Sequence, residues 1–299
     1  FLFFKSGISI KTFLKILNQL SLEKIDKTKF CRRRVFQTIV NFDIYLNLLK
    51  KKNPNFSTFF TNHLASALHR YWEAAFPFDY VEPIQPLQWR KSYRNEIYFS
   101  MQIFYKQIRD LINYSRKREN CEIWICSSMG QTAVKNYKVV SSQLFITNEK
   151  SFFHKLGIDF TLFNRKPTMM PRYTYESKNL EEIKKLSNKL LNLYIDNKPV
   201  ALVKQMDAES NQQTIGGNTI SLRIISCNKI PKIHFYGKEC TLTELGMEMI
   251  EVDDKSGTSA YHIPQGVLMI FGADSNRFNS REEINTINIS KMIIDSINS

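Results

Sequence analysis

The sequence predicts an α/β protein, a three-layer sandwich in which helices cover a mainly parallel sheet. Segments with helical periodicity alternate with short apolar segments, which is typical of parallel sheets. The 299 residues are 43% hydrophobic, which is enough for a substantial core and excludes global disorder. Mixed, polar sequence separates residues 1–130 from residues 256–299. We therefore expect one α/β core built from these two parts, with an inserted α+β cap at residues 131–255.

Helical periodicity is clearest in the first 120 residues. Residues 8–21 form the first expected helix, with one apolar stripe made of Ile10, Phe13, Leu14, Ile16, Leu17 and Leu20. The second, over residues 35–52, ends at three lysines followed by Asn53 and Pro54, a helix stop signal. Residues 63–76 and 93–117 are the third and fourth. The last expected helix spans residues 282–297.

Short apolar segments predict the strands of the core. Residues 55–62 are apolar and β-branched, which favours a buried strand. Residues 122–128 and 267–272 have the same character and stand before and after the expected cap. Within the cap, the pattern predicts a helix at 178–194 and strands at 199–205 and 219–226.

Positive charge is concentrated at the start of the chain. The formal net charge is +14, and residues 1–120 hold 21 Lys and Arg against 9 Asp and Glu. Such an excess points to nucleic acid or to an anionic surface, although a lysine-rich solvated surface explains it more simply. The densest runs are Arg32, Arg33 and Arg34 and the lysines at 50–52. They either contact phosphate-bearing ligands or form solvated helix faces.

Composition also argues against several kinds of site and segment. The 10 glycines are too few for glycine-rich phosphate loops. The five cysteines are odd in number and irregularly spaced, which argues against a disulfide framework and against a zinc ribbon. No apolar run approaches the ~18 residues of a membrane span. The start at Phe1 without a methionine favours a shortened chain, in which Phe1–Phe4 are the end of a signal core or strand.

Three segments in a fixed order carry motif-like residues. Residues 62–72 place His69 near the end of an Asn-His-Leu-Ala-Ser-Ala-Leu-His-Arg-Tyr-Trp run. The apolar residues 123–126 then lead into Ser127-Ser128-Met129-Gly130, and His262 precedes Gly266 and a further apolar segment. In this order the segments resemble the alkaline phosphatase superfamily, specifically its nucleotide pyrophosphatase/phosphodiesterase branch. The closing residues 287–294 are similar to the same family's last helix.

The resemblance implies phosphoester hydrolysis by a Thr or Ser nucleophile and two zinc ions. Matched residue by residue, it makes His69 and His262 metal ligands. Ala65 stands where the family has an aspartate, and Ser128-Met129 stand where it has Asp-His. No segment before residue 35 matches the family's nucleophile. The resemblance thus implies a divergent phosphodiesterase-like protein with an impaired two-metal site, holding zinc or another divalent metal in degenerate form.

Other residues near these motifs are candidates for binding substrate. Arg70 and Trp72 form an Arg-aromatic cluster that could bind a base or sugar. Ser128 follows the expected strand at the end that would face the site. We therefore predict substrate contacts from Arg70, Trp72 and Ser128. His63 is expected to cap or pack rather than to bind metal.

Alternatives remain at this stage. His69 and His262 could be hydrogen-bonded remnants of a lost site. The chain could instead be a non-catalytic module that binds an anion or nucleic acid through its basic N-terminal third, or a structural scaffold. The phosphodiesterase-like protein and the non-catalytic binding module would both take a phosphate-containing or other anionic ligand. Convergence of the two imidazoles would favour the first, and a single patch of arginines would favour the second.

Overall fold

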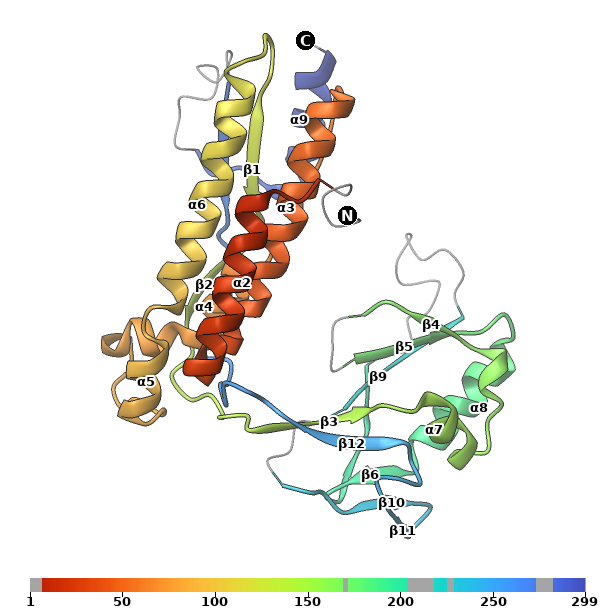
Figure 1. Ribbon diagram of the computed structural model, residues 1–299. Helices are drawn as coiled ribbons and strands as arrows, with labels where there is room; N and C mark the ends of the chain where they lie inside the picture. Colours follow the sequence, from red (N-terminus) through yellow and green to blue (C-terminus); the bar gives the residue numbers. More distant parts are fainter. Residues whose placement is uncertain (1–6, 169–171, 204–217, 225–228, 273–281, 299) are drawn as a thin grey trace. The chain divides into compact units, whose positions relative to one another are not determined.

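The computed structural model describes residues 7–168, 172–203, 218–224, 229–272 and 282–298 (Figure 1). The chain divides into two compact units. Unit 1 contains Phe1–Val139 and Ser256–Ser299, and unit 2 contains Val140–Lys255. Residues 131–139, assigned to the cap from sequence, belong to unit 1. The segment Phe1–Phe4, the cysteine at 227 and parts of the strands expected at 199–205 and 219–226 lie outside the described residues.

Helices make up most of unit 1. They are α2 (Ile10–Ile25), α3 (Arg33–Lys52), α4 (His63–Ala75), α5 (Leu87–Tyr93), α6 (Glu96–Ser115) and α9 (Ile289–Asn298). The helices predicted in the first 120 residues are confirmed, with small shifts of their ends. Ser9 caps α2 by accepting a hydrogen bond from the N–H of Thr12. Asn53 closes α3 in the left-handed conformation, with φ of 43°, immediately before Pro54.

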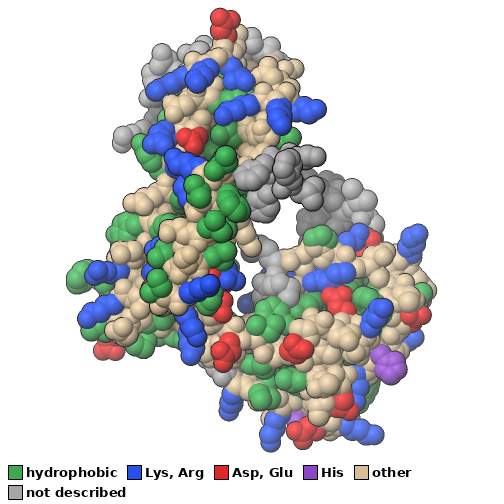
Figure 2. All heavy atoms as spheres, viewed as in Figure 1, with side chains coloured by type: hydrophobic (Ala, Val, Ile, Leu, Met, Phe, Trp, Pro, Cys, Tyr) green, Lys and Arg blue, Asp and Glu red, His purple; other side chains and the backbone are tan. Residues whose placement is uncertain are grey.

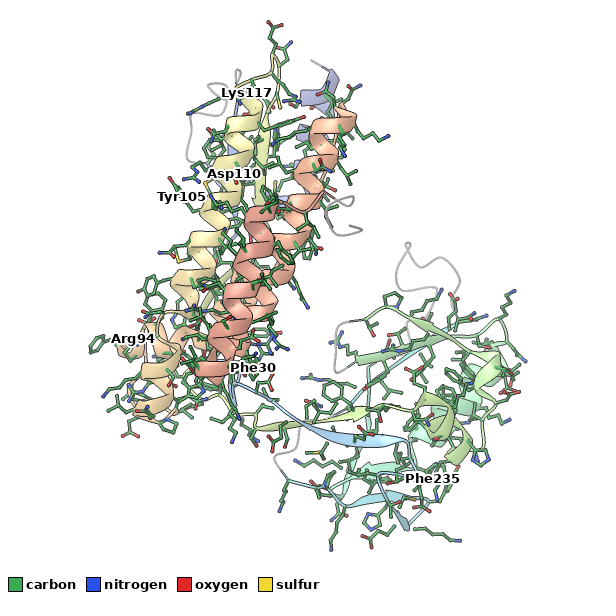
Figure 3. The ribbon with its side chains drawn as sticks, in the orientation of Figure 1. Phe30, Arg94, Tyr105, Asp110, Lys117 and Phe235 are labelled. Atoms are coloured by element: carbon green, nitrogen blue, oxygen red, sulfur yellow. The ribbon has the colours of Figure 1, made fainter. Side chains whose placement is uncertain are left out.

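Short helical segments connect these helices. The 3₁₀-helix η1 (Lys27–Arg32) joins α2 to α3, and η2 (Pro77–Asp79) follows α4. Arg94 lies between α5 and α6, whereas Tyr105 and Asp110 lie on α6 itself (Figure 3). Among the residues that pack in this unit, Tyr71 of α4 stacks on Tyr93 of α5 with ring centroids 5.2 Å apart. A buried cluster formed by Cys31, Ala67, Tyr71, Ala74, Tyr93 and Ile97 therefore holds α4 against its helical neighbours.

Two antiparallel ribbons complete unit 1. Strand β1 (Ile123–Ser127) pairs with β14 (Val267–Phe271), and β2 (Gly130–Ala133) pairs with β13 (Ala260–Ile263). Gly266 lies in the turn between β13 and β14. A Cβ at this position would stand 1.8 Å from the carbonyl oxygen of Ser127, so only glycine permits the close approach of the two backbones.

Unit 2 is an α+β structure with its own hydrophobic core. One four-stranded sheet has the order β4 (Asn164–Lys166), β5 (Arg172–Glu176), β9 (Thr219–Arg223), β8 (Ala201–Val203). The other has the order β11 (Lys238–Cys240), β10 (Ile233–Phe235), β6 (Leu193–Ile195), β7 (Lys198–Pro199). Strands β3 (Ser142–Ile146) and β12 (Met247–Glu251) form a separate pair. The helical segments are α7 (Glu149–Lys155), η3 (Phe160–Leu162) and α8 (Leu180–Leu190).

The core of unit 2 is centred on aromatic side chains. Phe153 of α7 is fully buried, and its ring centroid lies 4.8 Å from that of Tyr175 and 5.1 Å from that of Phe163. Leu186 and Leu190 of α8 close the same cluster. Because this core contains residues of unit 2 alone, the insert has the packing of an independent layer structure.

The predicted three-layer sandwich around a parallel sheet is wrong. Every strand pair in the described part of the chain is antiparallel, and the sheets contain two or four strands. Two features of the sequence led to the wrong prediction of a parallel sheet. Residues 55–62 form no strand, because Phe59 packs against Phe42 and Tyr45 of α3 instead. Strands β1 and β2 pair with segments from the other end of the chain rather than through a helical crossover.

Candidate functional site

Helix α4 positions the candidate site because different faces of it carry different residues. His63, Ser66, Ala67 and Arg70 have the spacing i, i+3, i+4, i+7 and share one face. His69 precedes Arg70 by one residue and is therefore rotated by about 100° around the helix axis. The first face lies beside α3 and α6, and His69 contacts β13.

His69 and His262 meet at this second face. Their ring centroids are 4.6 Å apart and their planes are nearly perpendicular, at 86°. Nδ1 of His69 donates a 2.6 Å hydrogen bond to the carbonyl oxygen of Ala260. That bond fixes the tautomer and leaves the Nε2 lone pair of His69 available for a ligand. We call these two residues the imidazole pair.

The electrostatic environment keeps His69 neutral. Burial lowers the pKa of His69, and the hydrogen bond to Ala260 opposes this only in part. The nearby His262 and Arg70 lower the pKa further. A neutral imidazole is the form that binds a metal ion. His262 is exposed at the end of the pair, so a ligand could reach both rings from solvent.

Gln131 adds an oxygen beside the imidazole pair. In the β2–β13 ribbon it is the cross-strand partner of His262, so the two side chains project from the same face. Its Nε2 donates a 3.2 Å hydrogen bond to the carbonyl oxygen of Ala65, and its Oε1 is buried with no hydrogen-bond partner. Ala65 is the position where the resemblance calls for an aspartate. Sequence alone could not single out Gln131, because its place depends on the strand pairing.

Carboxylates do not join the imidazole pair. Within the described ranges, no group of three or more His, Cys, Asp and Glu side chains is arranged to hold a metal ion. The donors available there are two imidazoles and one carboxamide oxygen, and none of them is a carboxylate or a thiolate. Nitrogen and oxygen donors of this kind suit a borderline divalent ion such as zinc, but without anionic ligands they bind it more weakly.

A second feature, which we call the arginine pocket, lies on the other face of α4. It is a small, partly open pocket lined by Cys31, Arg32, Arg34, Val35, His63, Ser66, Ala67, Arg70, Tyr71, Glu96 and Ser100. Three arginines therefore line one pocket, from the end of η1, from the first turn of α3 and from α4. Arg33 does not join them, because it is half-exposed and pairs with Glu23 at 2.6 Å.

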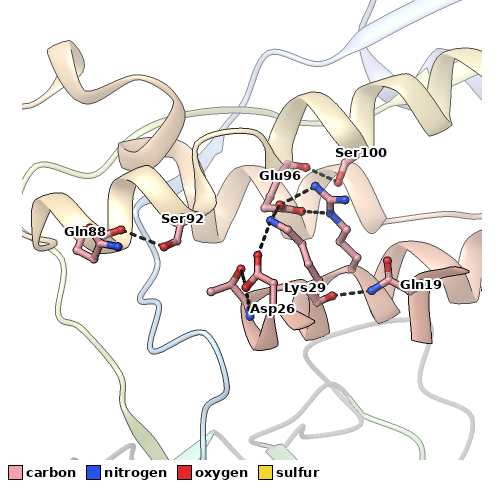
Figure 4. A network of polar contacts seen from close by, with 9 residues as sticks. Gln19, Asp26, Lys29, Gln88, Ser92, Glu96 and Ser100 are labelled. Atoms are coloured by element: carbon pink, nitrogen blue, oxygen red, sulfur yellow. Dashed lines mark hydrogen bonds and ion pairs between the residues drawn. The ribbon is translucent and has the colours of Figure 1, made fainter. Parts of the chain in front are cut away.

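Glu96 organises the arginine pocket (Figure 4). Its carboxylate accepts two hydrogen bonds from Arg32, at 2.7 and 2.9 Å, and one from Lys29 at 3.2 Å. Arg70 donates a 3.0 Å hydrogen bond to Oγ of Ser256. The lining residues thus include three arginines and one glutamate. Together with the hydroxyl of Ser66, arginine side chains of this kind suit a small oxyanion.

The other predicted site residues are Trp72, which lies one helical turn after His69 on α4, and Ser128. Trp72 donates from Nε1 to Asp79 at 2.7 Å and packs against Phe76 with ring centroids 5.3 Å apart. Ser128 follows β1 and is exposed. Within the part of the chain that the structure describes, neither makes a hydrogen bond or ring contact with His69 or His262.

His63 packs, as the sequence analysis predicted. It is 3% exposed, its Nε2 donates to the carbonyl oxygen of Ser100 at 3.2 Å, and its Nδ1 lies 2.7 Å from Oγ1 of Thr61. Burial lowers its pKa. The ring is therefore a neutral wall of the arginine pocket, with both nitrogens already engaged.

Comparison of the chain with protein-family models, curated proteins and solved structures finds no match in any of the three. Among the described helices, none combines the length and the apolar character needed to cross a lipid bilayer.

Proposed function

We propose that this chain is a divergent phosphodiesterase-like protein that binds a phosphate-bearing ligand and lacks efficient hydrolysis. The observation that carries the proposal is the meeting of His69 and His262, which come from segments far apart in the sequence. The hydrogen bond from His69 to Ala260 supports it, because metal-binding histidines are commonly oriented in this way. The resemblance of the three motifs points to the same chemistry.

His69 and His262 would hold a zinc or similar divalent ion, with Gln131 as a neutral third donor. When bound, such an ion polarises a phosphoryl oxygen. His69 contributes by presenting Nε2 in a fixed orientation and in the neutral state. Ala65 and Ser128-Met129 supply none of the carboxylate or imidazole ligands that a second ion would require. Binding of the phosphate group is therefore the expected activity, with hydrolysis near background.

Zinc binding tests this proposal directly. We expect isothermal titration with zinc to show one site, and we expect His69→Ala and His262→Ala each to weaken that site more than about tenfold. His154→Ala is the matched control, because His154 is exposed on α7 in unit 2. Hydrolysis of bis(4-nitrophenyl) phosphate should stay at background in all four proteins. Unchanged zinc affinity in both site variants would exclude the metal site.

A non-catalytic anion-binding function without metal is the second candidate, and the arginine pocket is the observation that favours it. We expect inorganic phosphate to bind in the presence of EDTA, and the double variant Arg34→Gln/Arg70→Gln to bind at least about tenfold more weakly. This magnitude follows because hydrogen bonds to charged groups contribute about 1.5–3 kcal/mol. The measurement is phosphate titration at low and high salt.

The matched control for the pocket is Arg94→Gln/Arg109→Gln. It removes the same two charges from exposed positions outside the lining. An equal loss of phosphate affinity in both double variants would show that the affinity depends on net charge alone. It would contradict specific binding in the arginine pocket. Phosphate binding that requires zinc and survives the pocket variant would favour the imidazole pair instead.

A further inference from the structure

Helix α2 turns its apolar stripe away from the rest of unit 1. The most exposed members are Ile25 at 85%, Ile10 at 67% and Leu14 at 59%; Leu17, Leu20 and Phe13 are also exposed. The opposite face of the same helix is polar and buried, and consists of Thr12, Gln19 and Glu23. Figure 2 shows hydrophobic side chains at the surface where α2 runs. This arrangement is the reverse of an ordinary amphipathic surface helix.

Specific hydrogen bonds hold α2 in this orientation. Glu23 accepts two hydrogen bonds from Arg33, at 2.9 and 2.6 Å, and a third from Nε2 of Gln19 at 2.9 Å. Gln19 also donates to the carbonyl oxygen of Lys29 at 2.8 Å. At the other end, Ser9 binds Asp43 of α3 through its N–H and its hydroxyl. Rotation of α2 to bury the stripe would leave these buried polar groups without partners, so the stripe is presented outwards.

The composition of the stripe indicates an apolar partner. Single exposed hydrophobic side chains are common on protein surfaces, but several of them on one side of the same helix mark an interaction surface. The 16 residues of α2 span about 24 Å at 1.5 Å per residue, so the stripe is long and narrow. A long, narrow apolar stripe fits a helix that lies parallel to a flat apolar boundary.

Positive charge borders the stripe. Lys11 and Lys15 follow one edge of α2, and Lys106 of α6 lies beside Lys15. Burial, together with the neighbouring ammonium groups of Lys106 and Lys11, lowers the pKa of Lys15 to about 8. The carboxylate of Asp43 opposes this effect only in part. Like charges are therefore gathered next to the apolar surface, and an anionic partner would relieve their repulsion.

We propose that α2 docks on an anionic membrane surface, with its apolar stripe in the boundary between headgroups and acyl chains. Lys11, Lys15 and Lys106 then face the lipid phosphates and carboxylates. Interfacial helices combine an apolar face with flanking lysines in this way. A second copy of the chain fits less well, because a symmetric contact across α2 would bring the same lysines together from both sides. The proposal is independent of the zinc and phosphate sites.

Vesicle co-sedimentation tests this docking. We expect binding to phosphatidylcholine vesicles that contain roughly one-third phosphatidylserine, and much weaker binding to phosphatidylcholine alone. The double variant Leu14→Gln/Leu17→Gln should bind about a hundredfold more weakly, because each leucine loses its apolar burial in the lipid. Both residues are exposed, and Trp fluorescence checks that the variants remain folded.

The control variant is Leu180→Gln/Leu191→Gln. It makes the same chemical change at two leucines of unit 2 that are exposed to a similar degree, at 42% and 52%. We expect it to bind vesicles like the unmodified chain. The variant Lys11→Gln/Lys106→Gln should lose about fivefold per lysine on the anionic vesicles, and little on phosphatidylcholine.

Three results would overturn the proposal. The first is no binding of the unmodified chain to the anionic vesicles. The second is equal loss of binding in the α2 and unit 2 leucine variants. The third is a dimer in light scattering that the Leu14→Gln/Leu17→Gln variant converts to a monomer, since the stripe would then be an interface between copies of this chain.

Discussion

Replacing Glu73 with alanine is expected to lower the free energy of unfolding of unit 1 by about 3–5 kcal/mol. Glu73 lies on α4 and is fully buried. Its carboxylate accepts hydrogen bonds from the N–H groups of Ile84 and Gln85, at 3.1 and 2.8 Å, and from the hydroxyl of Tyr137 at 2.8 Å. Alanine would leave these buried donors without this acceptor, and each unsatisfied group costs about 1–3 kcal/mol.

The same substitution should loosen the candidate site. Glu73 lies one helical turn after His69, and its hydrogen bonds attach residues 84–85 and the segment after β2 to α4. Arg90 lies 3.9 Å from the carboxylate and would lose its nearest counter-charge. A burial-raised pKa keeps Tyr137 as a hydrogen-bond donor, and the neighbouring Glu73 strengthens this effect. Loss of Glu73 therefore acts on both α4 and the ribbon that carries Gln131.

Urea unfolding followed by Trp fluorescence measures this effect in unit 1 alone. The chain has three tryptophans, at positions 72, 89 and 124, and all belong to unit 1. Glu82→Ala is the matched control, because Glu82 is exposed in the same connection, and it should stay within about 0.5 kcal/mol of the unmodified chain. A loss below about 1 kcal/mol for Glu73→Ala would contradict the structural role assigned to this carboxylate.

Glu96→Ala is expected to destabilise unit 1 by a similar amount, about 3–5 kcal/mol. Glu96 is 2% exposed and neutralises Arg32 and Lys29 at the base of the arginine pocket. Arg32 also lies over the ring of Phe99, 4.2 Å from its centroid, so its guanidinium is enclosed on two sides. Without Glu96 this cation would remain partly buried and unpaired, which is the costly state.

A double substitution separates the buried charge from simple loss of packing. Arg32→Met/Glu96→Met removes both charges and keeps most of the side-chain volume, so it should be markedly more stable than Glu96→Ala. Trp fluorescence in urea measures the unmodified chain, Glu96→Ala, the single variants Arg32→Met and Glu96→Met and the double variant, with Glu119→Ala as a control at an exposed position. Additive effects of Arg32→Met and Glu96→Met would contradict the coupling of the two groups.

The helices of unit 1 could be predicted because their signals are local. The cap at Ser9, the stop at Asn53-Pro54 and the apolar periodicity of α3, α4 and α6 depend on residues within a few turns. Strand pairing could not be predicted in this way. Short apolar segments look alike whether they enter a parallel or an antiparallel sheet, and the partners of β1 and β2 lie more than a hundred residues away.

The candidate site shows the same division. The motif resemblance selected His69 and His262 from sequence, and the structure brings their rings together. Arg70 and Trp72 were selected as one Arg-aromatic cluster, but Arg70 lines the arginine pocket whereas Trp72 hydrogen-bonds Asp79. Gln131 and Glu96 carried no sequence signal. Their importance comes from strand register in one case and from a buried carboxylate between two cations in the other.

The sequence by itself determined the four long helices and the basic character of the first 120 residues, and the two histidines that could share a ligand. Only the tertiary structure decided that the sheets are antiparallel, that three arginines and Glu96 line one pocket, and that the apolar stripe of α2 points outwards. The physical reason is that helix signals act over a few residues. Pairing, burial and charge neutralisation depend on contacts between segments that the linear sequence does not place together.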